Sequence, residues 1–213
     1  MGKYQAVIFD LDGVICFTDQ YHYQAWKAVA DELGIYFDEA INNRLRGVSR
    51  MDSLNIILER YDGALTAQQK EALAEKKNGL YRKLLENMSP ADLPSEVKET
   101  LCALRALGLK LAIGSSSKNT RFILERLGLG NAFDAISDGT NITRSKPDPQ
   151  VFLMAADFLG LPPSHCLVVE DARAGIEAAV AGEFDSAALG EASACGLATY
   201  ALHRFSQLTD ICR

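Results

Sequence analysis

The chain has 213 residues, a length that suits one catalytic domain with a small insert. Hydrophobic residues make up 48% and charged residues 23%, proportions that favour a folded globular protein over a disordered one. The formal net charge of −6 argues against a nucleic-acid partner, because such proteins neutralise phosphates with a clustered basic face.

The five cysteines are widely spaced and form no C-x-x-C pair, so the sequence predicts reduced thiols and no cysteine-based metal or redox centre. Reduced thiols are typical of the cytoplasm. The N-terminal segment lacks the apolar region of a secretory signal, and no apolar run is long enough to span a membrane. We therefore expect a cytoplasmic, monomeric protein without a membrane or nucleic-acid partner.

The first part of the chain predicts one strand followed only by helices. A short apolar run at 4–9, YQAVIF, stops at an acidic loop, which is typical of a buried parallel strand that ends in a functional loop. Hydrophobic residues then recur every three or four positions and predict helices at 18–33, 51–61 and 66–84. The third of these helices begins with a capping-box pattern.

Strands and helices alternate in the rest of the chain. Apolar runs predict strands at 109–113, 133–137, 166–170 and, more weakly, 186–189. Helices are predicted at 95–107, 120–127, 149–159 and 172–181. Such alternation is typical of a parallel sheet covered on both faces. The predicted fold class is α/β: a Rossmann-like parallel-sheet core (1–16 and 92–213) with a small α-helical cap domain (17–91) inserted after the first strand.

Polar residues follow four of the predicted strands, and ligands bind beyond the carboxyl ends of the strands in open parallel sheets. The four groups are Asp10-Leu11-Asp12-Gly13, Ser115 to Ser117, Ser145-Lys146-Pro147 and Glu170-Asp171. Each group alone has an ordinary structural explanation as a turn, a helix cap or an exposed lysine. Their occurrence at four strand ends favours one shared site.

These residue types suit phosphoryl transfer. Asp10 can attack phosphorus and form an aspartyl phosphate. Asp12 lies two residues further on, points to the same side of an extended segment, and can donate a proton to the leaving oxygen. Lys146 supplies a positive charge that can bridge nucleophile and phosphate, and Pro147 is expected to hold this lysine at the mouth of its loop.

A magnesium site is predicted in the same place. Mg²⁺ prefers hard oxygen ligands, and the sequence offers the carboxylates of Asp10, Glu170 and Asp171 together with the carbonyl oxygen of Asp12. A bound cation would relieve the repulsion between the attacking carboxylate and the phosphate.

The ordered motifs D-x-D, Ser, Lys and an acidic pair resemble those of the haloacid dehalogenase superfamily along nearly the whole chain. Within it, F-D-L-D-G-V-I, Y-H-Y-Q-A-W-K, R-G-V-S-R, K-K-N, S-S-S-K-N and S-K-P-D-P resemble segments of the β-phosphoglucomutases. The resemblance implies that Asp10, Asp12, Ser115 and Lys146 are catalytic. It implies a substrate site formed by His22, Trp26, Arg46, Gly47, Val48, Ser49, Arg50, Ser53, Lys77, Ser116, Lys118 and Asn119. His22 and Trp26 can equally be packing residues.

The implied reaction interconverts β-glucose 1-phosphate and glucose 6-phosphate through an aspartyl phosphate and a glucose 1,6-bisphosphate. A phosphatase that hydrolyses sugar phosphates with the same machinery is the alternative, and a non-catalytic phosphosugar-binding protein is a further one. The chain departs from the family at Phe17, where relatives carry a polar residue, and in the segment around the fifth strand. The tail from Cys195 is also unfamiliar, so the sequence defines the edge of the sheet less clearly than its centre.

Overall fold

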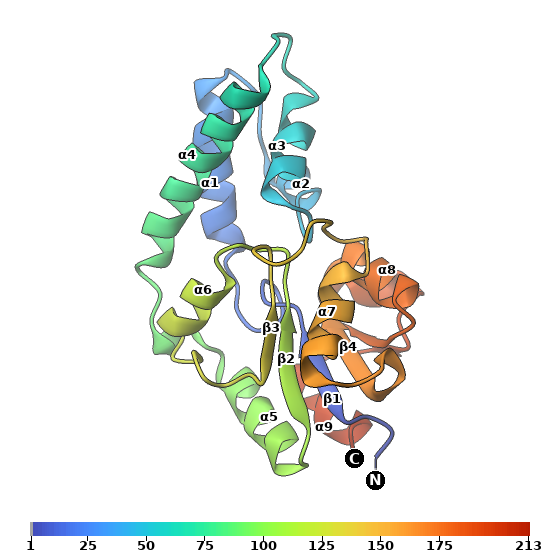
Figure 1. Cartoon of the computed structure of the whole chain (residues 1–213). Coiled ribbons are helices and arrows are strands. Elements are labelled where there is room, and N and C mark those ends of the chain that lie inside the picture. Colours follow the sequence, from blue (N-terminus) through green and yellow to red (C-terminus); the bar gives the residue numbers. More distant parts are fainter. Residues whose placement is uncertain (1) are drawn as a thin grey trace.

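The computed structural model of the protein describes residues 2–213, which contain six strands in one parallel sheet of order β3-β2-β1-β4-β5-β6 (Figure 1). The strands are β1 (Ala6–Phe9), β2 (Lys110–Gly114), β3 (Ala135–Ser137), β4 (Cys166–Glu170), β5 (Asp185–Ala188) and β6 (Tyr200–Ala201). The predicted α/β class and the five predicted strands are confirmed. The two-residue β6 was not predicted, because it is too short to carry a sequence period.

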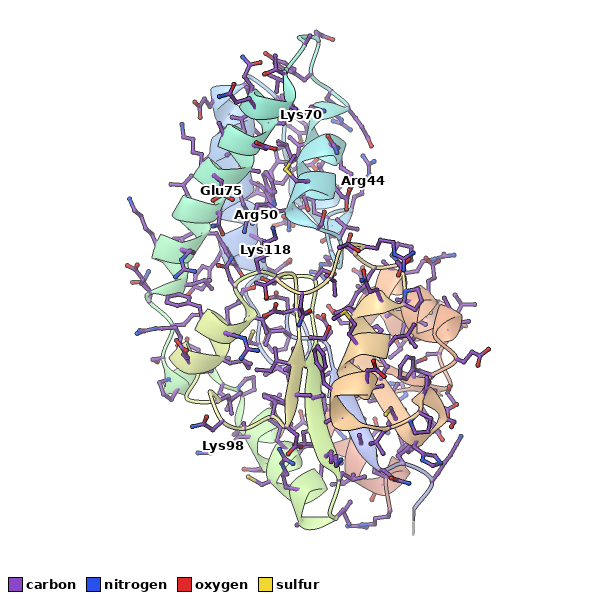
Figure 2. The ribbon with its side chains drawn as sticks, viewed as in Figure 1. Arg44, Arg50, Lys70, Glu75, Lys98 and Lys118 are labelled. Carbon is purple, nitrogen blue, oxygen red and sulfur yellow. The ribbon has the colours of Figure 1, made fainter. Side chains whose placement is uncertain are left out.

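Four helices form a separate helical unit above the sheet (Figure 1): α1 (Asp19–Glu32), α2 (Glu39–Asn43), α3 (Arg50–Leu58) and α4 (Ala67–Leu85). They enclose their own hydrophobic cluster, which includes Trp26, Leu54 and Ile57. The predicted capping box at the start of α4 is present. The five-residue α2 was not predicted. Figure 2 shows Arg50 of this unit and Lys118 of the α/β unit at the junction between the two.

Helices cover both faces of the sheet because alternate side chains of β1 point to opposite sides. Val7 and Phe9 belong to one cluster and Ala6 and Ile8 to another. The first cluster is closed by α5 (Ser95–Ala106), α6 (Thr120–Arg126) and α9 (Leu208–Ile211), and the second by α7 (Gln150–Leu159) and α8 (Arg173–Ala181). Within residues 2–213 no helix is both long and apolar enough to cross a membrane.

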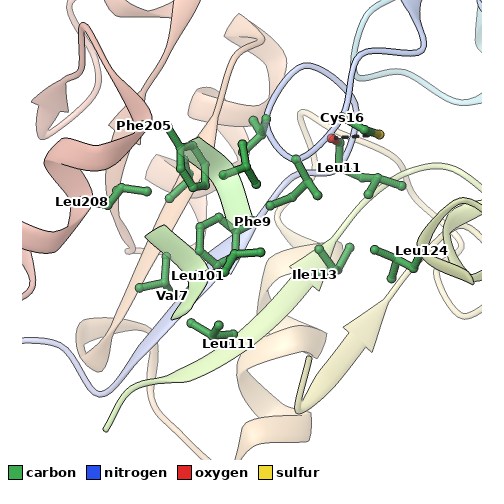
Figure 3. Packing of buried hydrophobic residues seen from close by; sticks show 14 of the residues in the cluster. Val7, Phe9, Leu11, Cys16, Leu101, Leu111, Ile113, Leu124, Phe205 and Leu208 are labelled. Carbon is green, nitrogen blue, oxygen red and sulfur yellow. Dashed lines mark hydrogen bonds between the residues drawn. The ribbon is translucent and has the colours of Figure 1, made fainter. Parts of the chain in front are cut away.

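The C-terminal tail is part of the main core. The ring of Phe205 stacks on Phe9 with a centroid distance of 5.8 Å, and Leu208 is fully buried nearby (Figure 3). Phe9 directly precedes Asp10, so the tail packs against the strand that carries the proposed nucleophile. This segment has no recognisable sequence pattern, because its structure depends on packing against the sheet rather than on a local period.

Two leucines of one helix segment test this packing. Leu104 of α5 is fully buried, whereas Leu107, three residues later, is 43% exposed. We expect Leu104→Ala to lower the free energy of unfolding by about 2–5 kcal/mol, because it leaves a cavity in the core. Leu107→Ala should change it by no more than about 0.5 kcal/mol. Urea unfolding followed by circular dichroism measures both, and equal losses would contradict the described orientation of α5.

Candidate active site

A cavity of about 860 Å³ is lined by residues of both the helical unit and the loops that follow the strands. Every residue predicted for the site lines it except Lys146 and Glu170, which are buried next to Asp10. The predicted residues that line it are Asp10, Asp12, His22, Trp26, Arg46, Gly47, Val48, Ser49, Arg50, Ser53, Lys77, Ser115, Ser116, Lys118, Asn119 and Asp171. Segments far apart in the sequence therefore meet at one cavity.

Lys146 joins the ends of two neighbouring strands. Its Nζ lies 2.5 Å from Asp10 Oδ1 and 2.5 Å from Glu170 Oε1, and its side chain is fully buried. Burial alone would lower the pKa of Lys146, but the two carboxylates outweigh it and raise the pKa above its ordinary value. The expectation that Lys146 lies at the mouth of its loop is wrong. The ion pairs draw it inward behind Asp10, where it fixes one oxygen of the proposed nucleophile.

The surroundings of Asp12 raise its pKa towards neutral pH. Burial raises its pKa to about 6, assisted by the charge of Asp10 and opposed by a hydrogen bond that the Thr18 hydroxyl donates to Asp12 Oδ1. Tyr81 of α4 donates in turn to Thr18 Oγ1 at 3.0 Å. A carboxyl group with a pKa close to the working pH can both give and accept a proton efficiently.

Asp10, Glu170 and Asp171 each offer a carboxylate oxygen within 4.8 Å of the others. Burial, together with the charges of Glu170 and Asp10, raises the pKa of Asp171 to about 8. Gly13 allows the close approach of Asp171, because a Cβ at this position would overlap its carboxylate. Crowded carboxylates that repel one another are a donor set that fits a hard divalent cation.

Glu170 differs from the other two acids of this cluster. One of its oxygens contacts Lys146, and the other accepts the backbone N–H groups of Asp171 and Ala172 at 2.9 Å each. Asp10 and Asp171 line the cavity, and Glu170 does not. The geometry therefore favours Asp10 and Asp171 as the acids that face a bound ion, with Glu170 holding Lys146 in place.

Loops of the two units contact each other around the cavity. Ser116 Oγ donates to the Gly47 carbonyl at 3.2 Å, and Ser145 Oγ donates to Asp52 Oδ2 at 3.0 Å. The buried Ser115 Oγ accepts the backbone N–H of Ser117 at 3.2 Å, which orders the loop after β2. These contacts hold the helical unit over the strand ends.

Arg46 also bridges the two units. It pairs with Asp19 at the start of α1 (2.7 Å) and approaches Asp171 at 3.7 Å. Val48, Ser49 and Ser53 follow it along the cavity wall, where the Ser49 hydroxyl caps α3 by accepting the backbone N–H of Asp52.

Lys77 of α4 is a buried lysine that lines the cavity. Its Nζ lies 2.9 Å from His22 Nδ1 and over the rings of Trp26 and Tyr81, at 4.9 and 4.5 Å from their centroids. Burial, together with the charge of Arg50, lowers the pKa of Lys77 to about 7. Burial and the same cations hold the pKa of His22 well below its ordinary value. His22 and Trp26 thus pack against Lys77 and also line the cavity.

Arg50 and Asn119 are linked through α4. Arg50 donates to Glu75 at 2.6 Å and to Asn78 at 2.9 Å, while Asn119 Nδ2 donates to Asn78 Oδ1 at 3.0 Å. Lys118, next to Asn119, is exposed and lines the cavity. The sequence prediction missed Glu75. Its spacing of four residues from Glu71 and three from Asn78 was a helical signal that could have placed all three on one face.

The buried position of Lys77 predicts a pH effect on stability. Between about pH 7 and 10.5 the unfolded chain holds a proton on this lysine that the folded chain has lost, so the contribution of Lys77 to the free energy of unfolding rises with pH across this window. Lys77→Met should be more stable than the wild type at pH 7, by a margin that shrinks towards pH 9.5. Lys83→Met, an exposed lysine of the same helix, should keep the pH profile of the wild type. Urea unfolding at pH 7, 8 and 9.5 measures this, and a margin that does not depend on pH would refute it.

Comparisons with known proteins identify the family of the chain. Residues 4–182 match the model of the haloacid dehalogenase-like hydrolase family. The chain is 44% identical over 177 residues to a protein of Bacillus subtilis named β-phosphoglucomutase, covering 82% of this chain and 78% of that one. It is 31% identical to a phosphorylated carbohydrates phosphatase of Thermotoga maritima, covering 82% and 80%.

The fold also matches a solved structure. A crystal structure of β-phosphoglucomutase from Clostridium difficile superposes with a TM-score of 0.91 at 35% identity, covering 96% of this chain and 93% of that one. The family match spans the four strand-end motifs and the helical unit between the first two of them. The chain therefore belongs to the haloacid dehalogenase-like hydrolase family.

Proposed function

We propose that this protein is a β-phosphoglucomutase that interconverts β-glucose 1-phosphate and glucose 6-phosphate. The observation that carries the proposal is the polarity of the cavity. The strand-end loops contribute Asp10, Asp12 and the acidic cluster to its lining, and the helical unit contributes Arg50 and Lys77. A mutase needs two phosphate sites of this kind, because the phosphoryl group moves between two hydroxyls of one sugar.

In the proposed reaction, a carboxylate oxygen of Asp10 attacks phosphorus, and the bond between phosphorus and the sugar oxygen breaks. Asp12 gives a proton to that leaving oxygen. In the reverse direction Asp12 takes the proton from the attacking hydroxyl as the phosphoryl group leaves Asp10. Its pKa of about 6 suits both roles. Glucose 1,6-bisphosphate is the intermediate, and it must change its orientation in the cavity between the two steps.

A magnesium ion is part of the proposal. Asp10 and Asp171, with the carbonyl oxygen of Asp12 and with Glu170 nearby, are the residues that would hold it, and the crowding of these acids supports this. When bound, it supplies positive charge that offsets the repulsion between phosphate and carboxylate. Lys146 contributes in the same direction from behind Asp10.

We further propose that residues 17–91 act as a cap domain that keeps water away from the aspartyl phosphate. The hydrogen bonds from Ser116 to Gly47 and from Ser145 to Asp52 support this, since they join the helical unit to the strand-end loops. Exclusion of water is what separates a mutase from a phosphatase on the same machinery.

A phosphorus NMR time course tests the proposed reaction. With Mg²⁺ and traces of the bisphosphate, β-glucose 1-phosphate should convert to glucose 6-phosphate. Asp10→Asn should slow this by about 10³-fold or more, because the nucleophile is lost. Removal of Mg²⁺ with a chelator should abolish it. Release of inorganic phosphate at a rate equal to or above isomerisation would instead establish a sugar-phosphate phosphatase.

The far end of the cavity has its own test. Arg50→Ala should reduce isomerisation by about 10²-fold, because a charged group that holds the second phosphate is lost. The slow rate at which this variant hydrolyses a small phosphate ester such as phenyl phosphate should stay within about threefold of the wild-type rate, since this ester is expected to contact Asp10 and not Arg50. Arg44→Ala is the control, because Arg44 pairs with Glu59 and does not line the cavity (Figure 2). Equal losses in both assays would argue against a separate phosphate site at Arg50.

A further inference from the structure

Glu75 of the helical unit forms an ion pair with Arg50, the cation that the proposed function assigns to the second phosphate. Glu75 Oε1 accepts from Arg50 Nη1 at 2.6 Å, and Asn78 Oδ1 accepts from Arg50 Nη2 at 2.9 Å. Glu75 itself lines the cavity, and Figure 2 shows it on α4 close to Arg50 of α3. A phosphate that bound both ends of this guanidinium would compete with Glu75.

The two partners of this ion pair differ in exposure. The side chain of Arg50 is 19% exposed, whereas that of Glu75 is 71% exposed. An exposed carboxylate can rotate into water at little cost, and such pairs stabilise by only about 0–1 kcal/mol. The partly buried guanidinium, by contrast, needs an acceptor for its N–H groups. Glu75 can therefore move away from the ion pair into water more easily than Arg50 can.

We propose that Glu75 is an exchangeable counter-ion of Arg50 and a specificity-determining residue of the site. This inference rests on the proposed function, because it takes Arg50 as the anchor of the second phosphate. In the empty cavity Glu75 holds the guanidinium in place. A phosphate dianion displaces it, since the phosphate carries more charge and three acceptor oxygens.

The exchange selects ligands by charge. A neutral hydroxyl does not compete with a carboxylate for an arginine, so a ligand without a second anionic group leaves the pair intact. A ligand with a phosphate at the far end from Asp10 gains Arg50 but must release Glu75. Glu75 therefore weakens the binding of every ligand that must displace it, so that only strongly anionic groups bind to Arg50.

Glu71 provides a matched comparison. It lies one turn earlier on α4 and also lines the cavity. Among residues 2–213, the carboxylate bonded to Arg50 is that of Glu75, and Glu71 makes no such contact. If Glu75 acts by direct exchange, neutralising Glu71 should have a much smaller effect than neutralising Glu75.

The test is a double-mutant cycle of equilibrium binding. Calorimetry measures the affinity for glucose 6-phosphate, without Mg²⁺ so that no turnover occurs, in the wild type, Glu75→Gln, Glu71→Gln, Arg50→Ala and Arg50→Ala/Glu75→Gln. We expect Glu75→Gln to bind about two- to fivefold more tightly than the wild type, and Glu71→Gln to differ by less than about 1.5-fold. In the Arg50→Ala background, Glu75→Gln should not increase the affinity for glucose 6-phosphate. Thermal melting of each variant verifies that it is folded.

An unchanged affinity in Glu75→Gln would overturn the inference. So would an equal gain in the Arg50→Ala background, because that would indicate a general effect of charge rather than exchange at the guanidinium. The cycle requires no catalysis, so its result is independent of the isomerisation assay. A protein that binds as expected but does not isomerise would refute the proposed function and keep the role of Glu75.

Discussion

The buried contact of Lys146 with Asp10 and Glu170 is the interaction on which the rest of the site depends. It joins the loop before α7 to the ends of β1 and β4, and it places one cation against two carboxylates. Lys146 and Glu170 do not line the cavity, whereas Asp10 does. A buried charge is tolerated only when it is paired and hydrogen-bonded, and the backbone N–H groups that bind Glu170 complete this requirement. Asp10 is thereby fixed, with its other oxygen left for chemistry.

Charge is unevenly divided across the cavity. Asp171 adds to the acids at the sheet, where carboxylates outnumber Lys146, whereas the helical unit contributes Lys77 and Arg50 to the cavity, with Glu75 paired to Arg50. Each end is therefore incomplete without a ligand of the opposite sign. The proposed divalent cation and the phosphate of the proposed substrate would complete the two sets of charges.

Much of the fold follows from sequence patterns that have a local cause. The apolar runs of β1, β2 and β4 and the capping box of α4 are such patterns, and the parallel sheet then brings the strand-end motifs together by topology alone. The burial of Lys146 could not be predicted, because a Ser-Lys-Pro segment looks like an exposed loop until carboxylates from two other strands surround it. The pairing of Glu75 with Arg50 depends on how α3 and α4 pack, which no local pattern specifies. The position of Phe205 on Phe9 has the same origin.

The stacking of Phe205 on Phe9 has a consequence for how the molecule is made. Strand β1 is among the first segments to be synthesised, yet its aromatic neighbour lies almost 200 positions further along the chain. Contacts between such distant parts form late, because the intervening segment must be ordered first. The emerging polypeptide therefore carries its proposed nucleophile from the start, on a strand whose hydrophobic cover stays incomplete until the tail is made. Activity should appear only when synthesis is nearly complete, and until then the central strand depends on other means to avoid association with neighbouring chains.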